Sequence, residues 1–265
     1  MDPVAWLYPE MRFGGFTDID GTVAFYARVN ALLGPRMTVL DFGCGPGSFD
    51  KDPVPWRRSL RVLRGKTAHV IGLDVDETAR NNPFVDEFRQ LSNGERWPVK
   101  SGTVDFVLCD FVLEHLTAPE AFFEEAARVL RREGMLAIRT PNLLSYFGLI
   151  ARWTPAALKT RCLKIAQPTR HESDVYPSYY RCNTVAKLRR ALQRNGFEHS
   201  VYGYEAEPSY LSFSKVAYVL GALHQRFAPR ACRLAIFGFG RLKRQKGAAL
   251  ELGTKLHAVS GVACG

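Results

Sequence analysis

A glycine-rich segment, VLDFGCGPG at residues 39–47, has the residue types and spacing that point most clearly to chemistry. Its glycines at 43, 45 and 47 permit a tight turn and let a ligand approach the backbone closely. The apolar run 37–42 predicts a strand that ends at this turn. Because open parallel sheets bind nucleotide-like ligands beyond the carboxyl ends of their strands, the segment predicts such a site.

Acidic side chains accompany the predicted strand ends. Asp41 lies inside the first strand, and Asp74 closes the next apolar run, residues 69–73. A carboxylate can accept hydrogen bonds from both hydroxyls of a ribose. A dinucleotide-binding fingerprint would need glycine where Ser48 stands, so a pyrophosphate ligand is disfavoured.

Strands and helices alternate along the first half of the chain. Strands are predicted at 37–42, 69–73, 104–109, 135–140 and 197–204, and helices at 23–33, 118–130 and 185–195. The alternation predicts an α/β fold with a parallel sheet and helices on both faces. After Thr140 it stops, and the aromatic and basic residues 143–184 are interpreted as an insertion over the sheet.

Residues 37–142 resemble the class I S-adenosylmethionine-dependent methyltransferases. The resemblance rests on the glycine-rich loop, Asp41 inside the first strand, Asp74 at the close of the second strand and the run DFVLCDFVLEHL at 105–116. It implies a Rossmann-like, mostly parallel seven-stranded sheet with helices on both faces. It also implies S-adenosyl-L-methionine as the cofactor.

The chain is accordingly divided into three parts. The predicted parts are an N-terminal helical segment 1–36 that contributes to the acceptor site, a cofactor-binding core 37–204 with a lid insertion at about 143–184, and a basic amphipathic C-terminal extension 205–265.

The resemblance also implies roles for single residues. The glycine loop would hold the methionine moiety of the cofactor, Asp74 would accept both ribose hydroxyls, and Val75 would flank the adenine. Gln90 stands where many family members have an acid near the adenine amino group, so that contact departs from the family pattern. The predicted cofactor-binding residues are Asp41, Gly43, Cys44, Gly45, Asp74, Val75, Gln90, Cys109, Asp110 and Phe111. The pair Glu114 and His115 is interpreted as structural.

The acceptor site is expected in the variable parts of the chain. Residues 170–184, RHESDVYPSYYRCNT, combine polar and aromatic groups at the density that a polar, ring-shaped substrate needs. His171 is the candidate general base, and Glu172 or Asp174 could orient its ring. The predicted acceptor-binding residues are Tyr26, Arg28, Asn142, Asp174, Tyr176, Tyr179, Tyr180 and Arg181. The six cysteines lack metal-ligand spacing, so no metal site is predicted.

The predicted reaction is O-methylation of a small-molecule or saccharide hydroxyl. The combined pattern of IDGTVAFYARV at 19–29, TPN at 140–142 and YPSYYRCNT at 176–184 resembles bacterial methyltransferases of cell-surface polysaccharide and natural-product gene clusters. Three alternatives stay open: N-methylation of a small molecule, RNA methylation, and a non-catalytic cofactor-binding partner subunit. Nucleic acid is the less favoured acceptor, because TPN is not an Asn/Asp-Pro-Pro-Tyr type of motif and no RNA-binding module is recognisable.

Charge is concentrated in one segment of a chain whose net charge is +10. Residues 208–246 contain eight basic residues and no acid, and 211–227 predict an amphipathic helix. This pattern fits either a solvated face or contact of residues 211–246 with an anionic membrane, which leaves a lipid-linked acceptor open. The longest apolar run, 216–223, is too short to span a bilayer, and the N-terminus lacks a secretory pattern. The expectation is a cytoplasmic protein, peripheral at the membrane surface if the helix docks there; its oligomeric state stays open.

Overall fold

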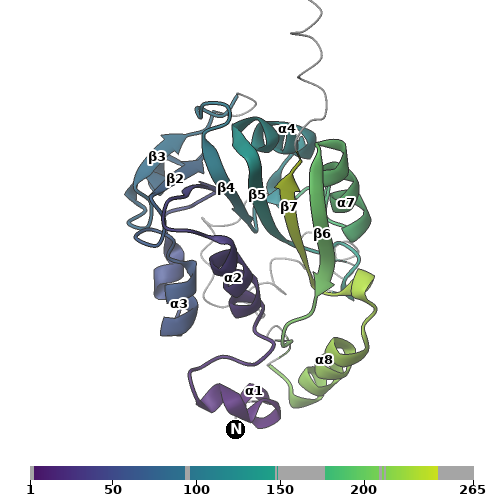
Figure 1. The fold of residues 1–265 in the computed structure, drawn as a ribbon. Coiled ribbons are helices and arrows are strands. Elements are labelled where there is room, and N and C mark those ends of the chain that lie inside the picture. Colours follow the sequence, from purple (N-terminus) through teal and green to yellow (C-terminus); the bar gives the residue numbers. More distant parts are fainter. Residues whose placement is uncertain are drawn as a thin grey trace, which may run out of the picture.

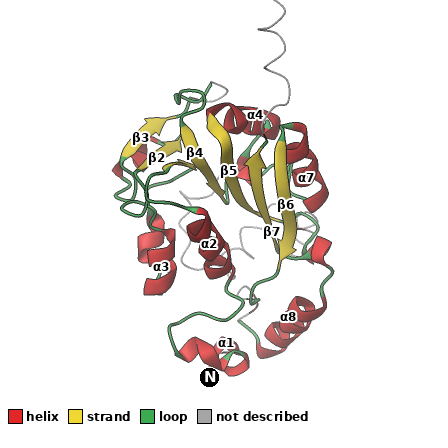
Figure 2. Cartoon of the chain, in the orientation of Figure 1, coloured by secondary structure: helices red, strands yellow, loops and turns green. Residues whose placement is uncertain are grey.

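The computed structural model describes residues 3–92, 96–146, 148, 177–208, 211 and 213–243. Seven strands form one sheet in the order β3-β2-β1-β4-β5-β7-β6 (Figures 1 and 2). They are β1 (Thr38–Phe42), β2 (His69–Asp74), β3 (Glu87–Gln90), β4 (Val104–Asp110), β5 (Leu130–Pro141), β6 (Phe197–Tyr204) and β7 (Ala235–Leu242). Strands β1 to β5 pair in parallel, whereas β7 runs antiparallel to β5 and β6. The predicted fold class is therefore confirmed.

Helices cover both faces of this sheet. The described α-helices are α1 (Pro3–Leu7), α2 (Gly21–Leu32), α3 (Pro55–Arg61), α4 (Pro119–Val129), α7 (Val185–Arg194) and α8 (Lys215–Phe227). On one face, Leu40 of β1 packs in a cluster with side chains of α4 and α7. On the other face, Val39 packs with side chains of α2 and α3. Successive β1 side chains thus enter two cores, which explains the continuous apolar run in the sequence.

The predicted C-terminal boundary needs correction. The predicted extension, 205–265, includes residues 235–242, but these form β7, which pairs with β5 and β6 inside the sheet. The sequence does not predict this strand, because Gly238 and Gly240 weaken its strand pattern. The structure supplies their reason: a Cβ at Gly238 would lie 3.0 Å from Leu188, and one at Gly240 would lie 3.1 Å from Phe197. The glycines let α7 and β6 pack closely.

Most of the predicted lid lies outside the described residues, namely 147 and 149–176. Its last part is described and lies beside the short 3₁₀ turn η4 (Leu113–His115), just beyond β4. There the backbone N–H groups of Tyr179 and Tyr180 donate to the Glu114 carbonyl at 2.7 and 3.2 Å. None of the helices in the described part of the chain is long and apolar enough to cross a bilayer.

Candidate cofactor site and its surroundings

The glycine-rich loop begins where β1 ends. Gly43 has a φ of +72° and donates its N–H to the Leu73 carbonyl at 2.7 Å. A Cβ here would collide with Val112, so both conformation and space require glycine. Gly45 has a φ of +53°, and a Cβ on it would meet no atom within 4 Å. The loop backbone therefore faces open space at Gly45, where a ligand can approach.

Asp74 holds this loop from the end of β2. One carboxylate oxygen accepts from the Gly45 N–H at 2.9 Å, and the other accepts from the Asp76 N–H at 2.9 Å. Each carboxylate oxygen has two acceptor positions, so both retain capacity for a ribose hydroxyl. Gln90 is the register partner of Asp74 on β3 and is exposed. The arrangement is compatible with the predicted role of Asp74 as the acceptor for the ribose hydroxyls, which stays a prediction.

Two exposed apolar side chains flank the loop region. Val75 follows Asp74 and is 43% exposed, and Phe111 follows β4 and is 44% exposed with a φ of +55°. A non-glycine residue at positive φ is uncommon, and such strain clusters at functional sites. Apolar surface at the strand ends fits the flat adenine ring of the cofactor. The residues present therefore fit S-adenosylmethionine.

Asn82 stabilises the loop from outside. Its amide donates to the Cys44 and Gly45 carbonyls at 3.1 and 2.9 Å, and its oxygen accepts from the Phe84 N–H at 2.9 Å. Sequence reasoning missed this residue, although an Asn before a proline is a turn signal. Burial raises the pKa of Cys44, as does the negative charge of Asp41, so the thiol is poorly suited as a nucleophile.

Cys109 at the end of β4 is fully buried, with 0% exposure. Burial raises the pKa of its thiol well above the usual range, and Glu114 adds to the rise. Its side chain is enclosed in the core, so the predicted contact with the cofactor stays a prediction and would involve its backbone. No cluster of three or more His, Cys, Asp or Glu side chains suited to a metal occurs among the described residues.

A buried ion pair joins the ends of β4 and β5. Arg139 donates from Nε and Nη2 to the two Asp110 oxygens at 2.7 and 2.8 Å, and the two side chains are 5% and 8% exposed. Tyr26 Oη donates to the same carboxylate at 2.8 Å. Burial alone would raise the pKa of Asp110, but the charge and hydrogen bonds of Arg139 hold it below its usual value.

This pair changes the interpretation of two predicted site residues. Asp110 was expected to contact the cofactor, and Tyr26 the acceptor, but their polar atoms are engaged with each other and with Arg139. Arg139 itself was missed, although an arginine within the apolar run MLAIRT is a signal of a buried partner. Its guanidinium also lies 4.6 Å from the Phe111 ring centroid, so the pair supports the strained Phe111 turn.

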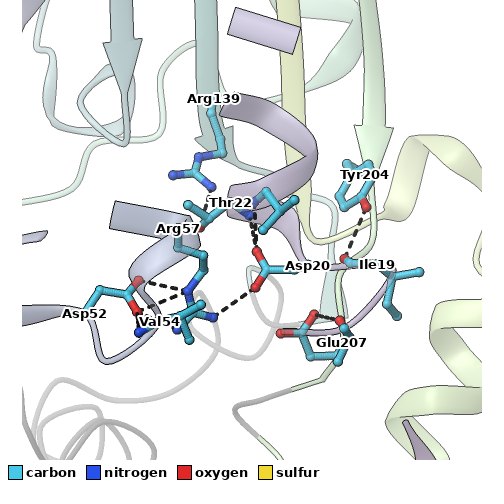
Figure 3. Close-up of polar contacts among 11 residues, drawn as sticks. Ile19, Asp20, Thr22, Asp52, Val54, Arg57, Arg139, Tyr204 and Glu207 are labelled. Atoms are coloured by element: carbon cyan, nitrogen blue, oxygen red, sulfur yellow. Dashed lines mark hydrogen bonds and ion pairs between the residues drawn. The ribbon is translucent and has the colours of Figure 1, made fainter. Parts of the chain in front are cut away.

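The start of α2 is fastened on both sides (Figure 3). Asp20 caps the helix by accepting from the Thr22 and Val23 N–H groups at 2.8 and 2.9 Å. Its other oxygen bonds Arg57 at 2.9 Å, and Arg57 also bonds Asp52 (Figure 3). These contacts hold α2 against α3, which places Tyr26 at the end of β4.

A second set of contacts fastens the residues before α2. Thr17 donates to Glu207 at 3.1 Å, and the Tyr204 hydroxyl donates to the Ile19 carbonyl at 3.1 Å (Figure 3). Tyr204 ends β6, so the N-terminal segment bridges from α3 to the far edge of the sheet. This placement is compatible with the predicted contribution of residues 1–36 to the site.

The remaining predicted acceptor residues fall into separate places. Arg28 lies on the outer side of α2, 6.0 Å from the ring centroid of Tyr202 on the edge strand β6. Asn142 is 0% exposed and donates its amide hydrogens to the Ala231 and Arg233 carbonyls, both at 2.8 Å. Its prediction as an acceptor ligand is corrected: both donors are used to tie β5 to the chain before β7.

The tyrosines of the lid segment lie nearer the cofactor residues. Tyr179 is 47% exposed beside η4, Tyr180 has a φ of +52°, and Arg181 is exposed. His115 bonds the Pro177 carbonyl through Nδ1 at 2.9 Å, which anchors this segment. His171, Asp174 and Tyr176 lie outside the described residues. Glu114 is buried and accepts from the Thr140 hydroxyl at 2.9 Å, in agreement with its expected structural role.

Asp41 adds a titratable group between the loop and the ion pair. Burial raises its pKa to about 7, and the negative charges of Asp110 and Asp74 add to the rise while Arg61 opposes it. A carboxyl with this environment is poised to respond to a cationic ligand, because a nearby positive charge favours its ionised form.

Asp41 therefore predicts a pH dependence of stability in the cofactor-free protein. The unfolded chain loses this proton near pH 4, whereas the folded chain keeps it to about pH 7. The folded state binds more protons in this window, so rising pH destabilises it by at most about 1.4 kcal/mol per pH unit, less for a partly exposed group. Asp41→Asn removes this term. Its stability advantage over the parent, measured by urea unfolding, should grow from pH 4 to 7 and then level off; an advantage independent of pH contradicts the assignment.

Comparison with known proteins identifies the family to which the chain belongs. A methyltransferase-domain family model matches residues 21–201. The Mycobacterium tuberculosis (strain H37Rv) protein named "Probable S-adenosylmethionine-dependent methyltransferase Rv3030" is 34% identical over 122 residues, which cover 43% of this chain and 40% of that protein. An uncharacterized 37.1 kDa protein of a Streptomyces fradiae transposon is 31% identical over 116 residues, covering 41% of this chain and 31% of its own length. The aligned regions thus span less than half of these relatives.

Solved structures agree at the level of the fold. A SAM-dependent methyltransferase from Archaeoglobus fulgidus has a TM-score of 0.51 at 17% identity, covering 89% of this chain and 99% of that one. The methyltransferase in complex with the Haloferax volcanii Trm112 activator has a TM-score of 0.54 at 16% identity, covering 85% and 91%. With the family model matching most of the chain and the loop geometry fitting its cofactor, the protein belongs to the class I S-adenosylmethionine-dependent methyltransferases.

Proposed function

We propose that this chain transfers the methyl group of S-adenosylmethionine to a hydroxyl of a small molecule or saccharide. The observation that carries methyl transfer is the Asp74 carboxylate, bonded to the open glycine loop at Gly45 and retaining acceptor capacity on both oxygens. The bound cofactor supplies an activated methyl group on its sulfonium. The protein positions the acceptor oxygen in line with it and takes up the hydroxyl proton.

The side chains near the proposed acceptor site are of the kinds that bind a polar, ring-shaped substrate. Tyr179 is exposed next to η4, and Arg181 follows it on the surface. The lid segment joins the described chain at Pro177, where His115 holds it beside the end of β4. His171 belongs to this segment and is proposed as the base that accepts the hydroxyl proton on its neutral ring nitrogen. The proposal includes acceptors carried on a lipid.

Asp74→Ala tests the cofactor part of this proposal. Loss of the charged acceptor should cost about 1–3 kcal/mol, which is a fall of about 5- to 150-fold in S-adenosylmethionine affinity by calorimetry. Glu87→Gln is the matched control. Glu87 is a half-exposed acid at the start of β3, whereas Asp74 lies beside Gln90 at the other end of that strand. Unchanged affinity in Asp74→Ala, or an equal loss in Glu87→Gln, would remove Asp74 from the cofactor site.

Turnover tests the acceptor part. The full chain is incubated with methyl-labelled S-adenosylmethionine and panels of sugars, phenols and amines, and the methylated atom is located by mass spectrometry. Label on oxygen supports the proposal, whereas label on nitrogen or on RNA replaces it. Cofactor binding without transfer to any of these acceptors would favour a non-catalytic partner subunit.

A further inference from the structure

The outward face of α8 is apolar and faces solvent. Val216, Leu220, Leu223 and Phe227 follow one another along a single stripe and are 72, 62, 50 and 73% exposed. Trp6 of α1 lies beside this stripe and is 55% exposed. We call these five side chains the α8 surface. Single exposed apolar residues are ordinary, but a continuous stripe across two helices indicates a binding surface.

The opposite face of α8 already has its partners. Tyr218 is fully buried and packs edge-on against Tyr8, with ring centroids 6.4 Å apart. A Cβ on Gly221 would lie 2.6 Å from Leu211 and 2.7 Å from Pro208, so the helix sits tightly on the chain beneath it. The helix is therefore apolar on both sides, and the outer side is available for a partner.

The surface also has a groove and a charged margin. An open groove of about 430 Å³ is lined by Trp6, Lys215, Val216, Val219 and Leu220. Lys215 and Arg226 are exposed on the same helix, and Arg230 is exposed just after it. Residues 208–246 contain no acid. An exposed Trp and Leu/Phe stripe with Lys and Arg at its margin is the combination that interfacial membrane helices use.

The charges argue against two other occupants, residues 143–170 and a second copy of the chain. The other long apolar stretch, residues 143–170, carries five basic residues and no acid, so it would bring like charge to the α8 surface. A second copy docked face to face would likewise bring its own Lys215 and Arg226 to the same margin. An anionic lipid surface satisfies both the apolar stripe and the cations.

The α8 surface lies toward the same edge of the sheet as the candidate cofactor site. Figure 1 shows α1 and α8 next to each other beyond the carboxyl end of β6. Strand β6 is antiparallel to β7, which is antiparallel to β5, so its carboxyl end lies on the same edge as Asp74 and Asp110. We propose that the α8 surface docks on an anionic lipid bilayer and turns the acceptor side of the molecule toward it.

Docking does not require methyl transfer, although a lipid-linked acceptor would deepen the proposed function. Flotation of the full chain with vesicles therefore tests it separately. We expect flotation with equimolar phosphatidylcholine and phosphatidylglycerol, much less with phosphatidylcholine alone, and weaker binding as salt screens the charges. No flotation with the anionic vesicles at low salt overturns the proposal, even if the protein binds S-adenosylmethionine and methylates a soluble acceptor.

Two variants separate the apolar and the charged contributions. Leu220→Glu combined with Phe227→Glu should weaken vesicle binding at least tenfold, because the loss of each buried apolar side chain has about that effect. Lys215→Glu combined with Arg226→Glu should weaken it roughly 30-fold or more. The matched control is Arg190→Glu with Arg194→Glu on α7, which removes the same number of cations elsewhere and should leave more binding intact.

Each variant is first checked for an unchanged melting temperature and S-adenosylmethionine affinity, which all of these exposed positions should preserve. Equal flotation of the parent and the Leu220→Glu, Phe227→Glu protein overturns the assignment of the α8 surface. The assignment also fails if sedimentation shows a dimer that only this double variant dissociates and anionic vesicles bind neither protein, because the occupant is then a second copy.

Discussion

His171→Ala is expected to slow methyl transfer to a hydroxyl acceptor by about 10²–10⁴-fold while S-adenosylmethionine affinity stays nearly unchanged. A hydroxyl is a poor nucleophile until its proton leaves, and a histidine with an ordinary pKa of about 6.5 is mostly neutral at neutral pH and can accept that proton. Asp74 and the glycine loop, which are predicted to hold the cofactor, lie outside the segment that contains His171. The rate of methyl transfer should therefore fall in this variant while the cofactor affinity does not.

Two other histidines serve as references for His171→Ala. His199→Ala changes a half-buried ring on the edge strand β6 and should leave the rate within about threefold. His115→Ala removes the bond to Pro177 and reports how much of the effect comes from positioning the segment. A normal rate in His171→Ala eliminates the base role. A parallel fall in cofactor affinity would show instead that the substitution disturbs the cofactor site.

Arg139→Met is expected to lower the free energy of unfolding by about 3–5 kcal/mol. The substitution keeps much of the side-chain volume but leaves Asp110 ionised and 8% exposed, with Tyr26 at 2.8 Å and Arg61 at 3.9 Å as its nearest partners. A buried charge without its main partner is costly because the low dielectric no longer offsets its lost hydration. Urea unfolding at pH 7 measures the loss.

The pH dependence identifies the cause of that loss. In the parent, Arg139 holds the pKa of Asp110 below its usual value, so the pair stabilises the fold at neutral pH and this contribution fades only in strong acid. In Arg139→Met only Arg61 and the Tyr26 hydroxyl still oppose the effect of burial, so the pKa of Asp110 should rise and the loss should shrink as pH falls. The double variant Asp110→Asn, Arg139→Met should recover part of the stability. A loss below about 1 kcal/mol, or one independent of pH, would show that the ion pair contributes little.

The cofactor loop could be assigned from sequence because its chemistry is local. Gly43 and Gly45 adopt left-handed conformations that other residues rarely tolerate, so backbone geometry is written into residue type. Asp74 follows directly from the end of an apolar strand, and in a parallel sheet that position places it at the same edge as the loop. Strands β1, β2 and β4 were predicted because their apolar runs meet the two cores. Strand β6 has a mixed sequence, of which Phe197 and Val201 are buried in the core.

The partners of buried polar groups depended on contacts that no local pattern encodes. Asp110 and Arg139 are 29 residues apart, and their pairing follows from the neighbouring places of β4 and β5 in the sheet. Asn142 bonds carbonyls 89 and 91 residues away, which turned a predicted acceptor ligand into an internal tie. Asp110 and Asn142 were predicted as site residues because a polar side chain at a strand end can either bind a ligand or form an internal hydrogen bond.

Strand β7 is a part of the fold that the local sequence pattern did not predict. Its glycines and basic neighbours resemble a surface segment, but Gly238 and Gly240 are the residues that permit Leu188 and Phe197 to pack against the sheet. Local propensity could not reveal this, because the free energy that places β7 between β5 and β6 comes from ladder hydrogen bonds and packing with strands far away in the chain. The sequence by itself determined the cofactor loop and the central strands, where residue type dictates backbone conformation. Only the tertiary structure decided which polar side chains face the site and which face each other, because burial and pairing are properties of the assembled core.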